Sequence, residues 1–179
     1  MSDAKMKVSM PRGILLQDFE VLREKVLVKD QSKFLDGRLE KKLLAFRAAT
    51  GKGLDGSTIG PTKKGKKNRK QVTVCVSKDV LMSHVKCWRL AVLLHKLGHA
   101  LHFFSNRVTI NKVVPTHLHH GKCWKNMLYR AIKDDKDNEK LKSCAGSEES
   151  PKETCLYGGL CPWCGPKKLR KRGVKNDKK

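Results

Sequence analysis

Leu93-Leu94-His95-Lys96-Leu97-Gly98-His99-Ala100 places two histidines one helical turn apart in an apolar setting. Between residues 83 and 103 no proline interrupts the chain, and apolar residues and histidines recur at spacings of three and four, which predicts a long helix. On such a helix His95 and His99 project from one face and can bind the same metal ion. A third ligand must then come from another part of the chain.

The other histidines also gather near this helix. All seven lie between His84 and His120, and the run Thr116-His117-Leu118-His119-His120-Gly121 offers three candidates for the third ligand. A competing interpretation is that one or two rings fill a polar gap beside Trp88 and Trp124. The clustering of all seven histidines favours the metal site.

Two elements are predicted on either side of the motif helix. Residues 71–76 alternate polar and β-branched side chains, which predicts a strand, and Ser77 is a good N-cap for the segment that follows. A second helix is expected to open at His120-Gly121, to run to Ile132 and to end in the charged segment 134–142.

The remaining patterns are weaker. Residues 14–28 and 39–49 are compatible with helices, whereas 51–70 combines glycines with basic residues and predicts a flexible basic loop. The predicted organisation has four parts: an N-terminal helical or flexible segment (1–30), a main domain that includes the basic loop (31–142), a cysteine-bearing segment (143–166) and a basic tail (167–179).

Three motifs follow one another in a fixed order: Ser77-x-x-Val80-Leu81 after a strand, Leu93-Leu94-His95-x-x-x-His99-Ala100, and His120-Gly121-Lys122-x-Trp124-Lys125. Together they resemble the SprT-like zinc metalloprotease domain of the Spartan and germ-cell nuclear acidic protein type. The resemblance covers residues 72–133 best. It implies an α+β, zincin-like fold in which a small antiparallel sheet packs on the metal-binding helix, and it implies Zn²⁺ bound by His95, His99 and His120.

The resemblance fails at the residue that performs the family's chemistry. In such sites the glutamate after the first histidine accepts a proton from water activated by zinc, and position 96 is lysine. No glutamate occurs between Glu40 and Glu139, so no replacement base is evident in the motif helix. Lys96 is either a solvated residue of an inactive site, which leaves zinc as a structural clamp, or an unusual base in its neutral form.

The C-terminal cysteines predict a degenerate zinc ribbon. Cys161-Pro162-Trp163-Cys164-Gly165 is similar to the second half of the family's ribbon, and Cys144 and Cys155 are the candidates that complete a four-cysteine site. A thiol-redox role is the alternative, but such motifs open a helix after a strand, whereas this pair precedes a lysine-rich tail.

A formal net charge of +23 favours polyanionic partners. The candidate nucleic-acid contacts form two basic blocks: Lys63, Lys64, Lys66, Lys67, Arg69 and Lys70 in the first, and Lys167, Lys168, Arg170, Lys171 and Arg172 in the second. The second block also has the character of a nuclear-localisation signal. No apolar run is long enough for a signal peptide or a membrane span, so we expect a soluble nuclear protein.

These observations lead to three functional hypotheses. The first is a zinc-binding, DNA-associated nuclear protein related to proteases that act on DNA–protein crosslinks, with weak or no peptidase activity and with DNA and DNA-bound proteins as partners. The second is an active DNA-dependent metalloprotease with an unusual base. The third is a basic nucleic-acid-binding module without a catalytic site, in which the histidine spacing is accidental.

Overall fold

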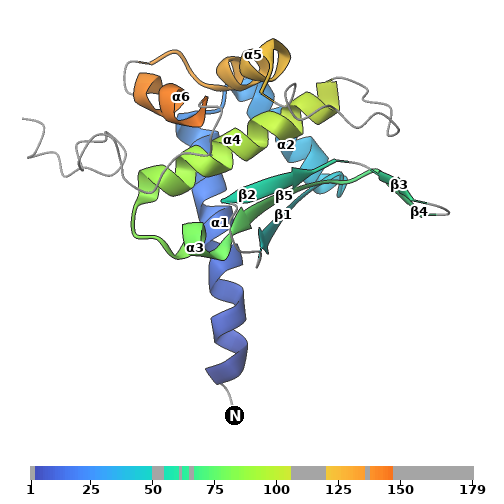
Figure 1. Ribbon diagram of the computed structural model, residues 1–179, viewed down its shortest axis with the longest axis vertical. Coiled ribbons are helices and arrows are strands. Elements are labelled where there is room, and N and C mark those ends of the chain that lie inside the picture. Colours follow the sequence, from blue (N-terminus) through green and yellow to red (C-terminus); the bar gives the residue numbers. More distant parts are fainter. Residues whose placement is uncertain are drawn as a thin grey trace, which may run out of the picture.

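A helix that is buried along most of its length organises the fold. In the computed structural model, which describes residues 3–49, 55–60, 62–64, 67–105, 120–135 and 138–146, α4 (Lys86–Ser105) lies between a small sheet and two further helices (Figure 1). Leu90, Leu94 and Leu97 are fully buried on it. Because α4 has neighbours on opposite sides, it is apolar on more than one face.

The sheet is mixed. Strand β1 (Leu44–Ala49) pairs parallel with β5 (Val72–Ser77), and β2 (Gly56–Ile59) pairs antiparallel with the other edge of β5. The antiparallel sheet expected from the sequence is therefore wrong for one of its two pairings. Parallel neighbours need a crossover connection instead of a tight turn, and the chain between β1 and β5 is long enough to provide one.

Residues 51–70 hold strands as well as loop. Besides β2, the strands β3 (Thr62–Lys64) and β4 (Lys67–Arg69) form an antiparallel hairpin that extends beyond the three-stranded sheet (Figure 1). The prediction of an unstructured basic loop is wrong for these segments. Their glycines and lysines hid the alternation on which strand prediction depends, and short edge strands carry little such signal.

Two helices at the N-terminus pack on the same core. Helix α1 (Asp3–Lys25) contributes Leu15, Phe19 and Leu22, all almost fully buried, and α2 (Lys29–Glu40) follows after a short break. A helix across 14–28 is thus confirmed up to Lys25. The helix expected at 39–49 is wrong, because α2 ends at Glu40 and β1 begins at Leu44.

An ion pair fixes α4 to α1. The guanidinium of Arg89 donates to both carboxylate oxygens of Asp18, at 2.8 and 3.3 Å, and also to the carbonyl of Ser83 at 2.6 Å. Asp18 is only 4 % exposed, so this pair is shielded from water. A buried bidentate pair of this kind sets the position of one helix along another.

The remaining predictions near the motif helix are largely confirmed. Ser77 caps the short helix α3 (Lys78–Met82), since its hydroxyl accepts from the backbone N–H of Asp79 at 3.2 Å. The second predicted helix is α5 (Lys122–Ala131), which begins just after Gly121. The charged segment after it does not end the helical structure, because α6 (Glu139–Ala145) follows.

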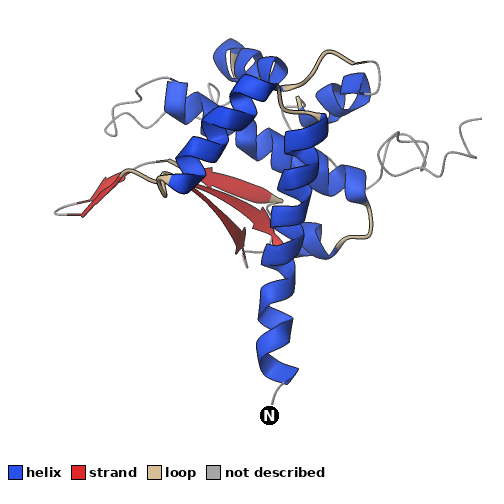
Figure 2. Ribbon diagram, turned by 180° about the vertical axis from the view of Figure 1, so that it is seen from behind, coloured by secondary structure: helices blue, strands red, loops and turns tan. Residues whose placement is uncertain are grey.

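Helices α5 and α6 cover the side of α4 that faces away from the sheet (Figure 2). The backbone N–H of Val28 donates to the carbonyl of Ala131, and that of Lys133 donates to Val26, so the end of α5 is joined to the break between α1 and α2. The C-terminal end of α5, the helix that follows His120, is thereby held against the core.

Candidate metal centre

Three histidines from two segments converge beside α4. His95 and His99 stand on α4, and His120 precedes α5 by two residues, with Gly121 in extended conformation as the N-cap. The Nε2 atoms are 3.3 Å apart for His95 and His99, 3.2 Å for His99 and His120, and 3.1 Å for His120 and His95. Of the three histidines predicted from the run before α5, His120 is the described one; His117 and His119 lie outside the described residues.

This spacing fits a single metal ion. An ion about 2.0–2.1 Å from each nitrogen in tetrahedral geometry holds its ligand atoms about 3.3–3.4 Å apart, close to the separations of the three Nε2 atoms. A gap-filling role beside Trp124 needs no such convergence. The three histidines can therefore hold a metal ion and leave a fourth position open.

A backbone carbonyl orients the most buried ring of the triad. Nδ1 of His95, which is 1 % exposed, lies 2.9 Å from the carbonyl oxygen of Ala145 on α6. A carbonyl only accepts, so Nδ1 carries the proton and the Nε2 lone pair faces the other two histidines. Metal-binding histidines commonly have such a partner. The sequence missed it because α6 was read as the charged end of the preceding helix.

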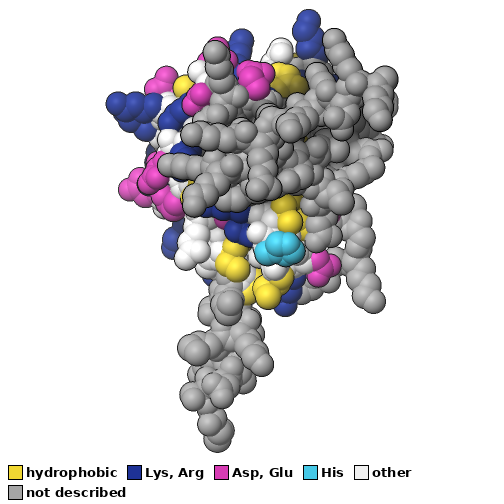
Figure 3. Space-filling view, turned by 90° about the vertical axis from the view of Figure 1, so that its left-hand side faces the viewer, with side chains coloured by type: hydrophobic (Ala, Val, Ile, Leu, Met, Phe, Trp, Pro, Cys, Tyr) yellow, Lys and Arg dark blue, Asp and Glu magenta, His cyan; other side chains and the backbone are white. Residues whose placement is uncertain are grey.

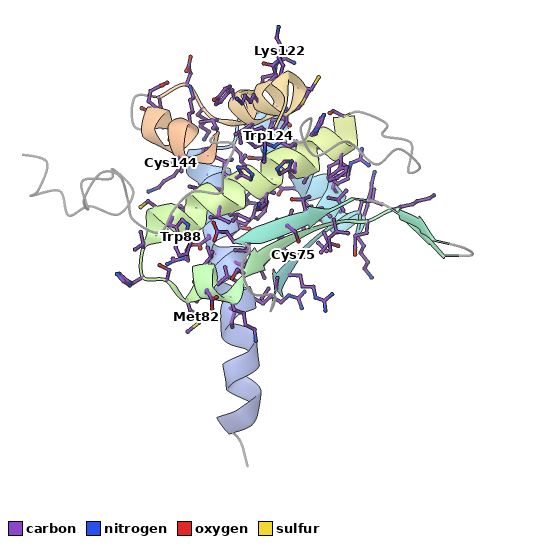
Figure 4. All side chains as sticks on the ribbon, in the orientation of Figure 1. Cys75, Met82, Trp88, Lys122, Trp124 and Cys144 are labelled. Carbon is purple, nitrogen blue, oxygen red and sulfur yellow. The ribbon has the colours of Figure 1, made fainter. Side chains whose placement is uncertain are left out.

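The indole of Trp124, which lies between α5 and α4 (Figure 4), contacts all three histidine rings. Its ring is stacked on His99 with centroids 5.0 Å apart, and lies 4.8 Å from His95 and 4.7 Å from His120. Gly98 leaves room for this approach, because a Cβ at that position would lie 3.2 Å from the indole Nε1, tighter than an ordinary contact. Gly98 and Trp124 therefore set how closely α5, and with it His120, approaches α4.

Lys96 is largely buried, with 8 % of the residue exposed. Its Nζ is not among the fully enclosed atoms that lack a partner, so the lysine is buried along its stem and not freely solvated as a surface lysine would be. Burial lowers the pKa of its ammonium, and the negative charge of Asp55 opposes that effect. The hydroxyl of Thr58 donates to the carbonyl of Lys96 at 2.8 Å, so strand β2 packs against this flank of α4.

The buried position of His95 makes the metal-free protein sensitive to acid. Burial, with a smaller effect from the charge of Lys96, lowers the pKa of His95 to about 4, although its hydrogen bond to Ala145 acts in the opposite direction. An unfolded histidine has a pKa of about 6.5, so between these values the unfolded chain binds a proton that the folded chain does not. We expect the free energy of unfolding of chelator-treated protein to fall by about 2 kcal/mol from pH 7 to pH 5 on this account.

Urea unfolding at several pH values measures this effect. His95→Gln should remove this part of the pH dependence, whereas His84→Gln, at an exposed histidine outside the triad, should leave it as in the wild type. Equal pH dependence in wild type and His95→Gln would contradict the assignment to His95.

The other predicted site residues are divided between described and undescribed parts of the chain. Cys144 is half-buried on α6, whereas Cys155, Cys161 and Cys164 lie outside the described residues. In the first basic block, Lys63, Lys64, Lys67 and Arg69 belong to the β3–β4 hairpin and Lys70 follows it, exposed; Lys66 and the second block (167–172) lie outside the described residues.

Comparison with known proteins gave no relative. No protein-family model matches the chain, and no curated protein or solved structure matches it. Among the described residues, no helix has both the length and the apolar character needed to cross a membrane.

Proposed function

We propose that this protein is a SprT-like, zinc-binding and DNA-associated nuclear protein with weak or no peptidase activity. The observation that carries the proposal is the convergence of His95, His99 and His120 beside a lysine at position 96. The α+β arrangement, with the two-histidine helix packed on a small sheet and the third histidine at the head of the next helix, is compatible with a SprT-like fold.

The donor set supports zinc in particular. Three neutral imidazoles with one open position form a common zinc site, and imidazole nitrogen suits zinc better than it suits calcium or magnesium, which prefer oxygen. When bound, zinc supplies a Lewis acid. The residues of this chain supply the rest of the site: Ala145 fixes the orientation of His95, and Trp124 excludes water from one side of the triad.

Lys96 argues against efficient peptidase chemistry. A protonated ammonium accepts no proton, and loss of a general base typically costs about 10²–10⁴-fold in rate. Among the described residues, Asp55 is the acidic group whose charge acts on Lys96, and burial raises the pKa of its carboxyl. We propose that Asp55 balances part of the lysine's charge and does not serve as a base.

The charge distribution supports contact with DNA at one end of the molecule. The β3–β4 hairpin carries Lys63, Lys64, Lys67 and Arg69 and extends away from the body of the fold (Figure 1). On the face drawn in Figure 3, by contrast, the coloured basic and acidic side chains are interspersed. A hairpin with four basic residues that extends from the fold is a candidate for contact with phosphates.

Metal analysis of the purified protein tests the proposal. We expect about one zinc ion per chain bound by the triad, and less than about a tenth of that in His99→Ala, since two remaining imidazoles hold zinc weakly. Both proteins should carry Cys161→Ser and Cys164→Ser, so that cysteine-bound zinc does not obscure the result.

His84→Ala is the matched control, because it removes an exposed histidine that lies outside the triad. Its zinc content should equal that of the parent protein. An unchanged zinc content in His99→Ala would show that the triad is not the metal site.

A further inference from the structure

Lys96 stands on the flank of α4 that joins the triad to the sheet. It follows His95 directly and precedes His99 by three residues, so its side chain and that of His99 are neighbours on the helix surface. The Thr58 hydroxyl, bonded to the Lys96 carbonyl, holds β2 against the same flank. Position 96 therefore lies between the candidate metal centre and the edge strand of the sheet.

The ammonium of Lys96 has no bonded partner there. In the part of the chain that the structure describes, no hydrogen bond or ion pair joins its Nζ to another residue. Asp55 acts on it through charge alone. The residue as a whole is 8 % exposed, but its Nζ is not among the fully enclosed atoms that lack a partner. The ammonium has therefore lost part of its hydration and can still be reached by an anion, which would restore a charged partner.

A bound metal increases the need for an anion. This step rests on the proposed function, because it takes a divalent ion to be held by the triad. Three neutral imidazoles leave the ion's charge uncompensated, and the lysine adds a further positive charge beside it. The summed positive charge of the ion and the ammonium exceeds the single negative charge that Asp55 provides.

We propose that Lys96 makes the triad a binding site for a carboxylate anion. The ammonium donates a charge-assisted hydrogen bond to the carboxylate, whose negative charge also balances that of the ion in the triad. The two oxygens of a carboxylate can face two cations at once. A monatomic anion has no second atom with which to do so. Position 96, which holds the catalytic base in SprT-like proteases, would thereby have a new role. Its lysine would bind a carboxylate at the place where the peptide carbonyl of a substrate would otherwise bind.

Cobalt-substituted protein allows direct measurement, because the visible absorption of Co²⁺ responds to a change in its surroundings. Full-length protein loaded with Co²⁺ is titrated with acetate at constant ionic strength. We expect acetate to bind the wild type about 10–100-fold more tightly than it binds Lys96→Met, as for a hydrogen bond to a charged group. Lys96→Arg, which keeps the charge, should retain at least part of this difference.

Lys122→Met is the matched control. Lys122 is exposed on α5 and points away from α4 (Figure 4), so its removal lowers the net charge by the same amount without changing the proposed site. Its acetate affinity should stay within about twofold of wild type, as expected for a screened surface charge. An equal loss of acetate affinity in Lys122→Met and Lys96→Met would show that only net charge matters and would overturn the proposal.

A second arm identifies the source of the carboxylate. An acetylated tripeptide with a free C-terminal carboxylate is compared with its C-terminal amide and with acetate. Tighter binding of the free-acid peptide assigns the site to peptide ends, and equal binding of peptide and acetate assigns it to small acids; either result supports a carboxylate site.

Three further results would overturn the inference. One is equal acetate affinity in Lys96→Met and wild type, and another is tighter binding of the peptide amide than of the free acid. The third is a large fall in the Co²⁺ affinity of Lys96→Met before any acetate is added, because the lysine would then itself be a ligand. A chain that takes up no Co²⁺ overturns the metal assignment first, and that failure is seen before the titration begins.

Discussion

Lys96→Glu is expected to raise peptidase activity by about 10²–10⁴-fold over the wild-type protein, the range that a general base supplies. The substitution puts a carboxylate where the motif helix carries an ammonium, directly after His95. The triad that would hold the metal is unchanged by it. The measurement is cleavage of a DNA-binding test protein by the zinc-loaded variant, with and without single-stranded DNA.

Lys96→Gln separates the two effects of Lys96→Glu, which are the removal of a positive charge and the addition of a base. It removes the positive charge beside the triad but provides no base, so its activity should stay near that of the wild type. Lys96→Glu/Asp55→Asn addresses the neighbouring carboxyl, since the charge of Asp55 acts on position 96 and would repel a buried glutamate. We expect the double variant to be at least as active as Lys96→Glu.

The outcomes of this comparison are distinct. Equal gains in Lys96→Glu and Lys96→Gln would show that the ammonium inhibits and that a base is present elsewhere. Efficient cleavage by the wild type that Asp55→Asn abolishes would identify Asp55 as that base and contradict our proposal of weak activity. No gain in Lys96→Glu, with zinc still bound, would mean that more than the base separates this protein from an active peptidase.

The sequence predicted the local features of the site well. Spacings of three and four placed His95 and His99 on one helix, and the expected opening of the next helix at His120-Gly121 agrees with the start of α5 at Lys122. These features depend on residues near one another in the chain. The family resemblance implied that His120 joins His95 and His99, and the structure brings the three Nε2 atoms within 3.1–3.3 Å of one another.

What the sequence missed depends on contacts between distant residues. The parallel pairing of β1 with β5 leaves no local signature, and propensity suggested a helix at 39–49 because alanines and leucines favour helices when packing is ignored. The carbonyl of Ala145 is 50 residues from the imidazole that it orients. The burial of Lys96 depends on β2, whose strand character was hidden in a segment rich in glycine and lysine.

Trp124→Ala is expected to lower the free energy of unfolding by about 3–5 kcal/mol, as for large aromatic residues removed from a core. Trp124 is fully buried and contacts all three histidine rings. Its loss leaves a cavity between α4 and α5, so the position of His120 relative to α4 is no longer fixed. We therefore also expect zinc affinity to fall about 10–100-fold, as when a supporting residue of a metal site is lost.

Trp124→Phe is the control for the stability measurement. Among the described buried side chains, the indole Nε1 of Trp124 is the nitrogen that lacks a hydrogen-bond partner. A phenyl ring keeps most of the apolar contact and removes that unsatisfied donor, so Trp124→Phe should cost much less than Trp124→Ala. Urea unfolding of metal-free protein and competition with a zinc chelator measure the two effects separately.

The contact between Trp124 and Gly98 predicts a coupling that a merely bulky core residue would not show. A Cβ at position 98 lies 3.1 Å from Leu128 Cδ1 and 3.2 Å from the indole Nε1, so in wild type Gly98→Ala should cancel much of the gain of about 1 kcal/mol that alanine has over glycine in a helix. In the Trp124→Phe background one of these close contacts is removed, and the same substitution should stabilise more. The difference between the two backgrounds is the coupling energy of the pair.

A coupling energy of zero between positions 98 and 124, or a cost below about 1 kcal/mol for Trp124→Ala, would show that the triad is positioned without this contact between α4 and α5.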